Sequence, residues 1–143
     1  MKYEKFEITV DHTETLEQMI LAGRYDWVNR DITTERFPLK GDGLVTRVAY
    51  LIHFDRKLSS DDVVDEIRRR GKRPASIQEL LAFGARYPNI QRRFLVVALD
   101  PSAEVGDQSR VACLYRVGPR RYLGLVRWDV VWYAYSHFLV FNE

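Results

Sequence analysis

The residues best suited to chemistry gather at the carboxyl-terminal end of the chain, where the last twenty-two residues hold seven of the eighteen aromatic side chains. In this segment, YLGLVRWDVVWYAYSHFLVFNE, the residues Tyr, Trp, Arg, Asp and Ser alternate with aliphatic ones. Large rings with a polar tip give contact area at a low cost in conformational entropy, and interleaved Arg and Asp add directional hydrogen bonds. The composition therefore indicates non-covalent recognition and names no particular ligand.

We expect the binding face to be formed by loops and strand ends between Arg116 and Ser136. Four charged side chains would supply polar contacts and three rings would supply apolar anchors. These residues are Arg116, Arg121, Arg127, Asp129, Trp132, Tyr133 and Tyr135. The three rings fall within four residues and cannot all point inward from one short segment, so at least one should be exposed. For Trp128, at the end of an expected strand, the core is favoured over the surface.

The basic residues allow a second interpretation. The densest basic run comprises Arg68, Arg69, Arg70, Lys72 and Arg73, and it is joined later by Arg92-Arg93 and Arg120-Arg121. If these groups converged on one face, they could neutralise phosphates and bind nucleic acid without sequence preference. The simpler explanation is that cations in the last turn of a helix are favoured by its dipole. Nucleic-acid binding is therefore the alternative, and a protein or other macromolecular ligand is the leading hypothesis.

Motifs for catalysis and metal binding are missing from the sequence. His12, His53 and His137 lie far apart, and none has a second histidine or cysteine at ligand spacing. There is no Gly-x-Ser-x-Gly, phosphate-binding glycine loop or His-Glu-x-x-His. Cys113 alternates with apolar residues in an expected strand, which favours a small buried thiol over a nucleophile. We expect a non-enzymatic protein without cofactor or metal.

One further polar group, Asp26, Asn29 and Asp31, lies in a segment that also contains Thr and Pro. Side chains of this kind commonly hold the turns of their own loop, and that role is favoured over a metal or substrate site.

Length and composition indicate one cytoplasmic domain. The 143 residues, 46% of them hydrophobic, are enough to close a core, and 22 basic against 20 acidic residues leave a net charge of only +2. A single cysteine excludes an intramolecular disulfide, and with no signal peptide this favours a reducing intracellular compartment. The longest apolar runs, such as residues 94–99, fall far short of the roughly 20 residues that span a membrane. No membrane association is expected.

The first forty residues predict a strand, a helix and a packed loop. Phe6, Ile8 and Val10 alternate with polar residues, as in a half-buried strand. Asp11 and Glu14 resemble a capping box for a helix that ends at Gly23. Residues 24–40 mix turn-forming residues with Trp27, Ile32 and Phe37, so this loop should pack its apolar side chains on the domain.

The remaining residues predict one strand, two consecutive helices and four strands. A strand at 45–54 precedes a helix capped by Ser59 or Ser60 and ended by Gly71. Pro74 suits the first turn of the next helix, in which Ser76 and Glu79 form a capping box before Pro88 ends it. The later strands are expected at 94–99, 110–117, 122–128 and 137–141, separated by turns at 100–108 and 118–119.

Helices clustered between strands indicate an α+β domain with a mainly antiparallel sheet. We expect the strand at 45–54 to pair with the final strand. From residue 43 onward this order resembles the C-type lectin-like fold, with residues 1–42 as an extension packed on that core within a single domain. Locally, residues 73–81 are similar to the opening of the second helix in the formylglycine-generating-enzyme branch, and residues 127–140 are similar to its final aromatic strand.

The resemblance implies a scaffold for binding and does not carry over the known chemistry of the family. Formylglycine-generating enzymes use a cysteine pair, whereas this chain has only Cys113. Calcium-dependent sugar binders carry Glu-Pro-Asn and Trp-Asn-Asp, and the nearest strings here, Asp100-Pro101-Ser102 and Trp128-Asp129-Val130, do not supply the ligands. The retroelement-diversified variable proteins display Tyr, Trp, Ser, Asp and Arg before the last strand, as does the segment from Arg116 to Ser136. This similarity implies the binding of a protein or other macromolecule.

Overall fold

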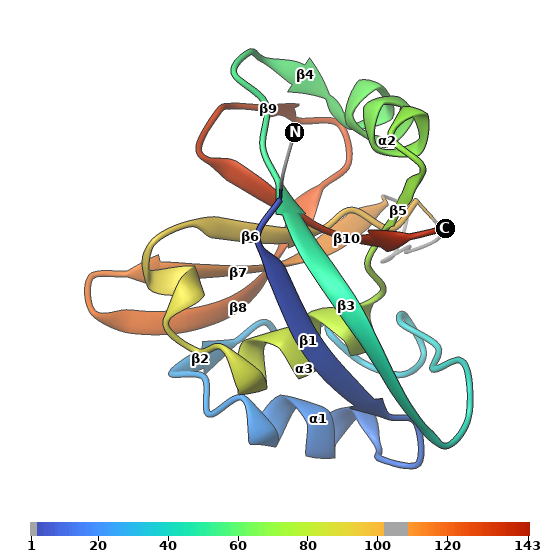
Figure 1. The fold of residues 1–143 in the computed structure, drawn as a ribbon. Coiled ribbons are helices and arrows are strands. Elements are labelled where there is room, and N and C mark those ends of the chain that lie inside the picture. Colours follow the sequence, from blue (N-terminus) through green and yellow to red (C-terminus); the bar gives the residue numbers. More distant parts are fainter. Residues whose placement is uncertain (1–2, 102–108) are drawn as a thin grey trace.

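The computed structural model describes residues 3–101 and 109–143 and shows an α+β arrangement with a mixed, mostly antiparallel sheet (Figure 1). Among these residues, eight strands form the main sheet: β1 Lys5–Asp11, β2 Trp27–Val28, β3 Leu44–Ile52, β5 Lys72–Pro74, β6 Leu95–Ala98, β7 Arg110–Val117, β8 Arg120–Arg127 and β10 Ser136–Asn142. A separate pair consists of β4 Leu58–Ser59 and β9 Val131–Trp132. The helices are α1 Leu16–Ala22, α2 Ser60–Arg69, α3 Ile77–Arg86 and a 3-10 turn, η1, at Ile90–Arg92.

The order of the main sheet is β1-β3-β10-β6-β7-β8-β2, and β5 also pairs with β10. Most neighbours are antiparallel, whereas β10 with β6 and β2 with β8 are parallel. The expected pairing of the strand near residues 45–54 with the last strand is confirmed, with Ile52 opposite Phe138 and Ala49 opposite Phe141. The final strand is therefore central, with β3 on one side and β6 on the other.

Helices cover both faces of this sheet. Leu139 and Phe141 point from β10 into the cluster beneath α1 and α3, whereas Phe138 and Val140 point into the cluster beneath α2. Alternate side chains of a strand face opposite sides of a sheet, so β10 is buried on both. This explains why its sequence reads as a continuous apolar run and not as an alternating one.

The helix ends follow the sequence in two cases and depart from it in a third. Ser59 caps α2 by accepting from the N–H of Asp62, and the capping box of Ser76 and Glu79 is present at α3. The expected box of Asp11 and Glu14 is wrong, because α1 begins later and is capped by Thr15 and Gln18. Strand β1 runs through Asp11, whose carboxylate instead accepts from Thr13.

The long-range pairing shows that the expected place of Pro74 in a helix is wrong, and it adds a strand to the loop at 24–40. Pro74 lies in β5 opposite Val140 and not in the first turn of α3, because β10 recruits the segment before the helix. The loop at 24–40 packs Ile32 and Phe37 into the core as expected, whereas Trp27 is exposed because it lies in β2 at the sheet edge. The turn at Gly118-Pro119 joins β7 to β8, whereas most of the expected turn at 100–108 lies outside the described residues.

The amino-terminal elements belong to the same sheet and core as the rest. Strand β1 pairs with β3 from Lys5 to Asp11, and α1 packs beside α3. Among the described residues, none of the helices combines the length and apolar character needed to cross a lipid bilayer.

Candidate binding surface

Tyr133 and Tyr135 lie in the loop between β9 and β10 and are exposed by 46% and 64%. Their rings are stacked, with centroids 6.1 Å apart and planes inclined by only 3°. The ammonium group of Lys57, which precedes β4, lies 5.2 Å from the centre of the Tyr133 ring. The exposure of Tyr133 and Tyr135 is as expected, and the structure adds their parallel arrangement and the cation beside them.

A second ring stack begins two residues later at His137, the second residue of β10. Its imidazole lies 3.9 Å from the Phe94 ring, inclined by 28°, and 4.7 Å from the His53 ring. The guanidinium of Arg93 lies 5.0 Å from the centre of the Phe94 ring. We call Tyr133, Tyr135, His137, His53 and Phe94 together the ring surface.

Strand pairing explains why the second stack was not foreseen from the sequence. His53 directly follows β3 and Phe94 directly precedes β6, and both strands are neighbours of β10. Only the central position of β10 places these three rings side by side. Burial lowers the pKa of His137, and the adjacent His53 lowers it further, whereas the Tyr135 C=O near its Nδ1 opposes the shift. The stack therefore favours neutral imidazole at His137.

Trp132 does not belong to this surface, which corrects the expectation that it is an exposed anchor. It is 4% exposed and packs edge-on against Phe138 with centroids 5.4 Å apart. Residues alternate across β9, so Trp132 points inward while Val131, 51% exposed, and Tyr133 point outward. The argument that at least one ring must be exposed is confirmed, but the exposed rings are the two tyrosines.

Arg121 is also buried and cannot supply the polar surface contact expected of it. It is 4% exposed, and its guanidinium donates to the C=O groups of Gly23, Gly84 and Pro88. The guanidinium also lies 4.8 Å from the centre of the Tyr25 ring. Burial lowers the pKa of Arg121 and raises that of Tyr25 to about 12. Arg121 therefore joins β8 to α3 and the loop after α1.

The other charged candidates are exposed but do not form one cluster. Arg127 and Asp129 make a two-point ion pair with N–O distances of 3.0 and 2.6 Å. Arg116 donates to the Gly118 C=O in the β7–β8 turn, at the opposite end of β8. The seven steps of β8 from Arg120 to Arg127 span roughly 23 Å. Arg116 is therefore remote from the Arg127–Asp129 pair, and the expected single face from residue 116 to residue 136 is divided.

Several cations of the expected basic run already have partners within the fold. Arg70 donates to the Tyr3 hydroxyl, Lys72 to Asn142, and Arg73 makes two hydrogen bonds to Glu79. Burial of Glu79 opposes its ionisation, but hydrogen bonds from Arg73 and Ser76 prevail and lower its pKa. Arg69 pairs with Glu66. The carboxylates of Glu66 and Glu79 offset the charge of Arg69 and Arg73, whereas the neutral partners of Arg70 and Lys72 occupy donors and leave the charge in place.

The polar loop 24–40 and Cys113 have structural roles. Asn29 accepts from the N–H of Asp31, Asp26 accepts from the N–H of Arg121, and Asp31 pairs with Arg110. Cys113 is buried as expected, and burial raises the pKa of its thiol to about 12. Within residues 3–101 and 109–143, no three His, Cys, Asp or Glu side chains gather as a metal site would require.

Comparison of the chain with protein-family models, curated proteins and solved structures finds no match in any of the three.

Proposed function

We propose that this protein is a non-enzymatic recognition module that binds a protein ligand through the ring surface. The observation that carries the proposal is the parallel pair of exposed rings at Tyr133 and Tyr135, next to the half-buried stack at His137. Amphipathic rings held in fixed positions are typical of binding hot spots, because little conformational entropy is lost when a ligand covers them.

The surroundings of the rings favour a protein ligand. Val131 adds an exposed aliphatic side chain two residues before Tyr133, and the exposed pair Arg127 and Asp129, which precedes β9, adds groups that can donate and accept. An apolar centre with a mixed polar border is the usual composition of a protein interface. Buried Trp132, which packs against Phe138, anchors β9 directly before Tyr133.

A C-type lectin-like arrangement is part of the proposal. It is supported by the pairing of β3 with β10, which encloses two consecutive helices, α2 and α3, between the first core strand and the later ones. In that arrangement the loops before the last strand form the binding face, which is where Tyr133 and Tyr135 lie.

Single-stranded nucleic acid is the second candidate, because cations lie beside both ring stacks. Lys57 lies beside Tyr133 and Arg93 lies beside Phe94. Bases stacked on rings with cations along the backbone are the usual mode of binding to single strands. The protein ligand is favoured because the basic run at 68–73 is largely engaged with Glu66, Glu79, Tyr3 and Asn142.

The test is affinity capture from the native host with cross-linking, comparing the parent protein with Y133A/Y135A. We expect the double variant to lose a specific protein partner, with affinity about 5- to 30-fold weaker once that partner is purified. The matched control is Trp27→Ala, which removes an exposed ring from β2 at the sheet edge four strands away from β10, and it should leave binding unchanged. Partners retained equally by all three proteins would contradict the proposal.

A parallel titration separates the two candidates. Labelled single-stranded DNA and RNA are added at about 50 and about 200 mM salt, where an electrostatic complex weakens steeply as salt rises. Tight binding that is lost in Y133A/Y135A and weakened by salt would favour nucleic acid and overturn the protein ligand.

A further inference from the structure

Strand β1 forms an edge of the main sheet, because among the described strands it pairs only with β3. In an antiparallel pair, alternate residues point their N–H and C=O groups toward the partner or away from it. The N–H of His12 donates to the Gly43 C=O across the pair, whereas the Glu7 C=O accepts from the Tyr87 hydroxyl outside it. Residues 5, 7, 9 and 11 therefore present their backbone groups outward.

Thr9 is the centre of this open edge. The C=O of Glu7 is occupied by Tyr87, and that of Asp11 accepts from the N–H of Glu14. Within the described part of the chain, no hydrogen bond reaches the N–H or C=O of Thr9 from outside the sheet, and its hydroxyl bonds to Thr46. Thr9 therefore offers one donor and one acceptor to an incoming strand.

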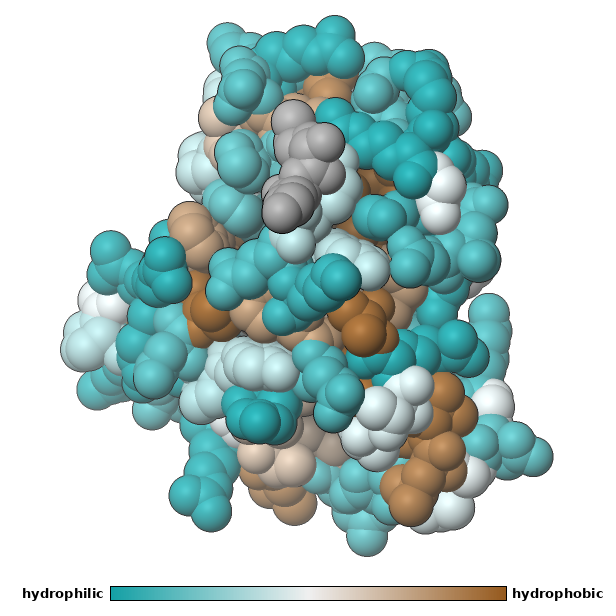
Figure 2. All heavy atoms as spheres, viewed as in Figure 1, coloured by the Kyte–Doolittle hydropathy of each residue, from teal (hydrophilic) through white to brown (hydrophobic). Residues whose placement is uncertain are grey.

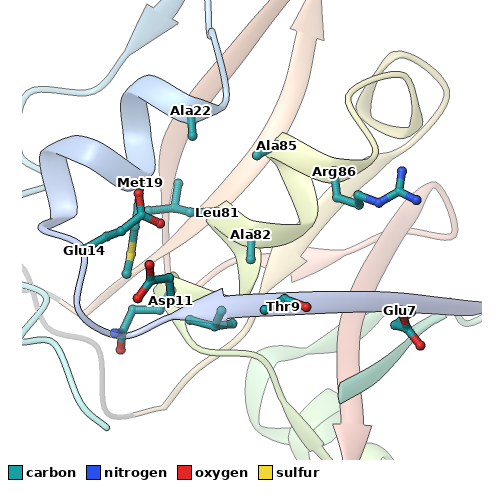
Figure 3. Close-up of a pocket in the computed structure, with 12 residues that line it drawn as sticks. Glu7, Thr9, Asp11, Glu14, Met19, Ala22, Leu81, Ala82, Ala85 and Arg86 are labelled. Atoms are coloured by element: carbon teal, nitrogen blue, oxygen red, sulfur yellow. The ribbon is translucent and has the colours of Figure 1, made fainter. Parts of the chain in front are cut away.

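A groove of about 350 Å³ runs beside this edge (Figure 3). Its wall opposite β1 is formed by apolar side chains of α1 and α3: Met19, Ala22, Leu81, Ala82 and Ala85. In Figure 3, Ala82 projects from α3 toward β1 across the gap. The short alanine side chains leave the space into which another chain could place side chains of moderate size.

The border of the groove is predominantly acidic although the whole chain carries a net charge of +2. Glu7, Asp11 and Glu14 line it, and among the lining residues that the structure describes Arg86 is the only basic one. Hydrogen bonds from the Thr13 hydroxyl and N–H lower the pKa of Asp11 and keep it ionised. The space-filling view of the β1–β3 side is mostly hydrophilic, with separated apolar patches (Figure 2).

We propose that this groove binds an extended basic segment of a partner protein by adding it as a strand to β1. The backbone of the segment would pair with Thr9, with its Lys or Arg side chains on the face of Glu7 and Asp11. The alternate side chains would be aliphatic and would contact Ala82 and Ala85, the part-exposed residues of α3 that line the groove. The four steps from Glu7 to Asp11 span about 13 Å, which matches a segment of about five residues.

Charge and location distinguish this site from other arrangements. A second copy of the chain would place carboxylates opposite carboxylates, which destabilises a strand pair. The groove lies beside α1 and α3, whereas β9, which leads into the ring surface, lies at the other end of the molecule (Figure 1). Charged side chains along a sheet edge also discourage pairing with other strands. The test must therefore show that binding depends on backbone hydrogen bonds and not on charge alone.

The probe is the peptide acetyl-Lys-Val-Lys-Val-Lys-amide, titrated at low salt while the backbone amide of Thr9 is followed by NMR. We expect saturable binding that shifts this resonance, and no binding of the matching Glu-Val peptide. Two further peptides keep the charge but carry N-methyl groups on the lysine or on the valine amides. One of the two methylated peptides should bind about tenfold or more weakly than the unmethylated peptide, because its methyl groups replace the N–H groups that face β1.

Variants locate the site. Ala82→Leu and, separately, Ala85→Leu should fill the groove and weaken peptide binding, and thermal unfolding shows which variant is folded. Glu7→Gln should weaken binding about two- to fivefold, whereas the control Glu35→Gln, an exposed carboxylate of the 24–40 loop, should not. Absence of binding at low salt would overturn the proposal. The proposal would also be overturned if both methylated peptides bound equally, or if neither Ala82→Leu nor Ala85→Leu changed the affinity. Each of these results would show that the peptide is held by unspecific charge attraction.

Discussion

The indole Nε1 of Trp132 donates a 2.8 Å hydrogen bond to the hydroxyl of Ser60, and both residues are buried. That hydroxyl in turn donates to the C=O of Trp128 at 2.7 Å. Ser60, the first residue of α2, is thereby joined to Trp128 and to Trp132, which are the two ends of a segment that contains β9. Because this segment is anchored from inside, the two following tyrosines are held outward at a defined place.

Replacing Trp132 should therefore test a core residue. We expect Trp132→Ala to lower the free energy of unfolding by about 3–5 kcal/mol, the usual cost of deleting a large buried ring. Val131→Ala, at the neighbouring exposed position, should change it by less than about 0.5 kcal/mol. Urea denaturation measures both, and equal small effects would mean that Trp132 is not part of the core.

Arg121→Lys should be destabilising although it preserves charge. A lysine ammonium cannot reproduce the planar set of donors that reaches the C=O groups of Gly23, Gly84 and Pro88. Each buried carbonyl left without a donor costs roughly 1 kcal/mol or more, so we expect Arg121→Lys to lower the free energy of unfolding by about 2–4 kcal/mol. The matched variant Arg120→Lys alters an exposed neighbour and should be nearly neutral in the same urea denaturation. A neutral Arg121→Lys would refute the role assigned to this guanidinium.

Gly84→Ala tests the packing between α3 and Tyr25. A Cβ at position 84 would lie 2.1 Å from the Tyr25 hydroxyl oxygen and 3.0 Å from Leu114. We expect this substitution to destabilise the protein, despite the roughly 1 kcal/mol that alanine gains over glycine inside a helix. Adding Tyr25→Phe removes the closest atom and should recover part of the loss. A double-mutant cycle measured by thermal unfolding gives this coupling, and strict additivity would argue against the contact.

The stability of the fold should depend on pH through His137. Its pKa is lower in the folded protein than its ordinary value of 6.5, so the unfolded chain binds more protons below that pH. The neutral His137 ring therefore contributes to the free energy of unfolding in full above pH 6.5, and this contribution is lost as the pH falls through the folded-state pKa. The loss of unfolding free energy from pH 7 to pH 5 should be smaller in His137→Phe than in the parent. An identical loss in both proteins would contradict the assignment.

Local sequence patterns determined the elements that depend on near neighbours. The serine caps of α2 and α3, the limits of β7 and the alternation in β1 all follow from contacts within a few residues. The start of α1 differs from the expected one because the pairing of β1 with β3 extends through Asp11, opposite Leu44. Hydrogen bonds with β3 thus keep Asp11 in the strand, and the helix is capped by Thr15 instead.

What the sequence by itself determined was the fold class, the pairing of the early and final strands, and exposed rings before the last strand. The tertiary structure decided which rings are exposed, because β9 turns Trp132 toward Ser60 and Tyr133 toward solvent. It also enclosed Arg121 among three carbonyl groups and brought Phe94 and His53 to His137 from strands on either side of β10. These arrangements depend on residues far apart in the chain, and their geometry is fixed only when the sheet is assembled.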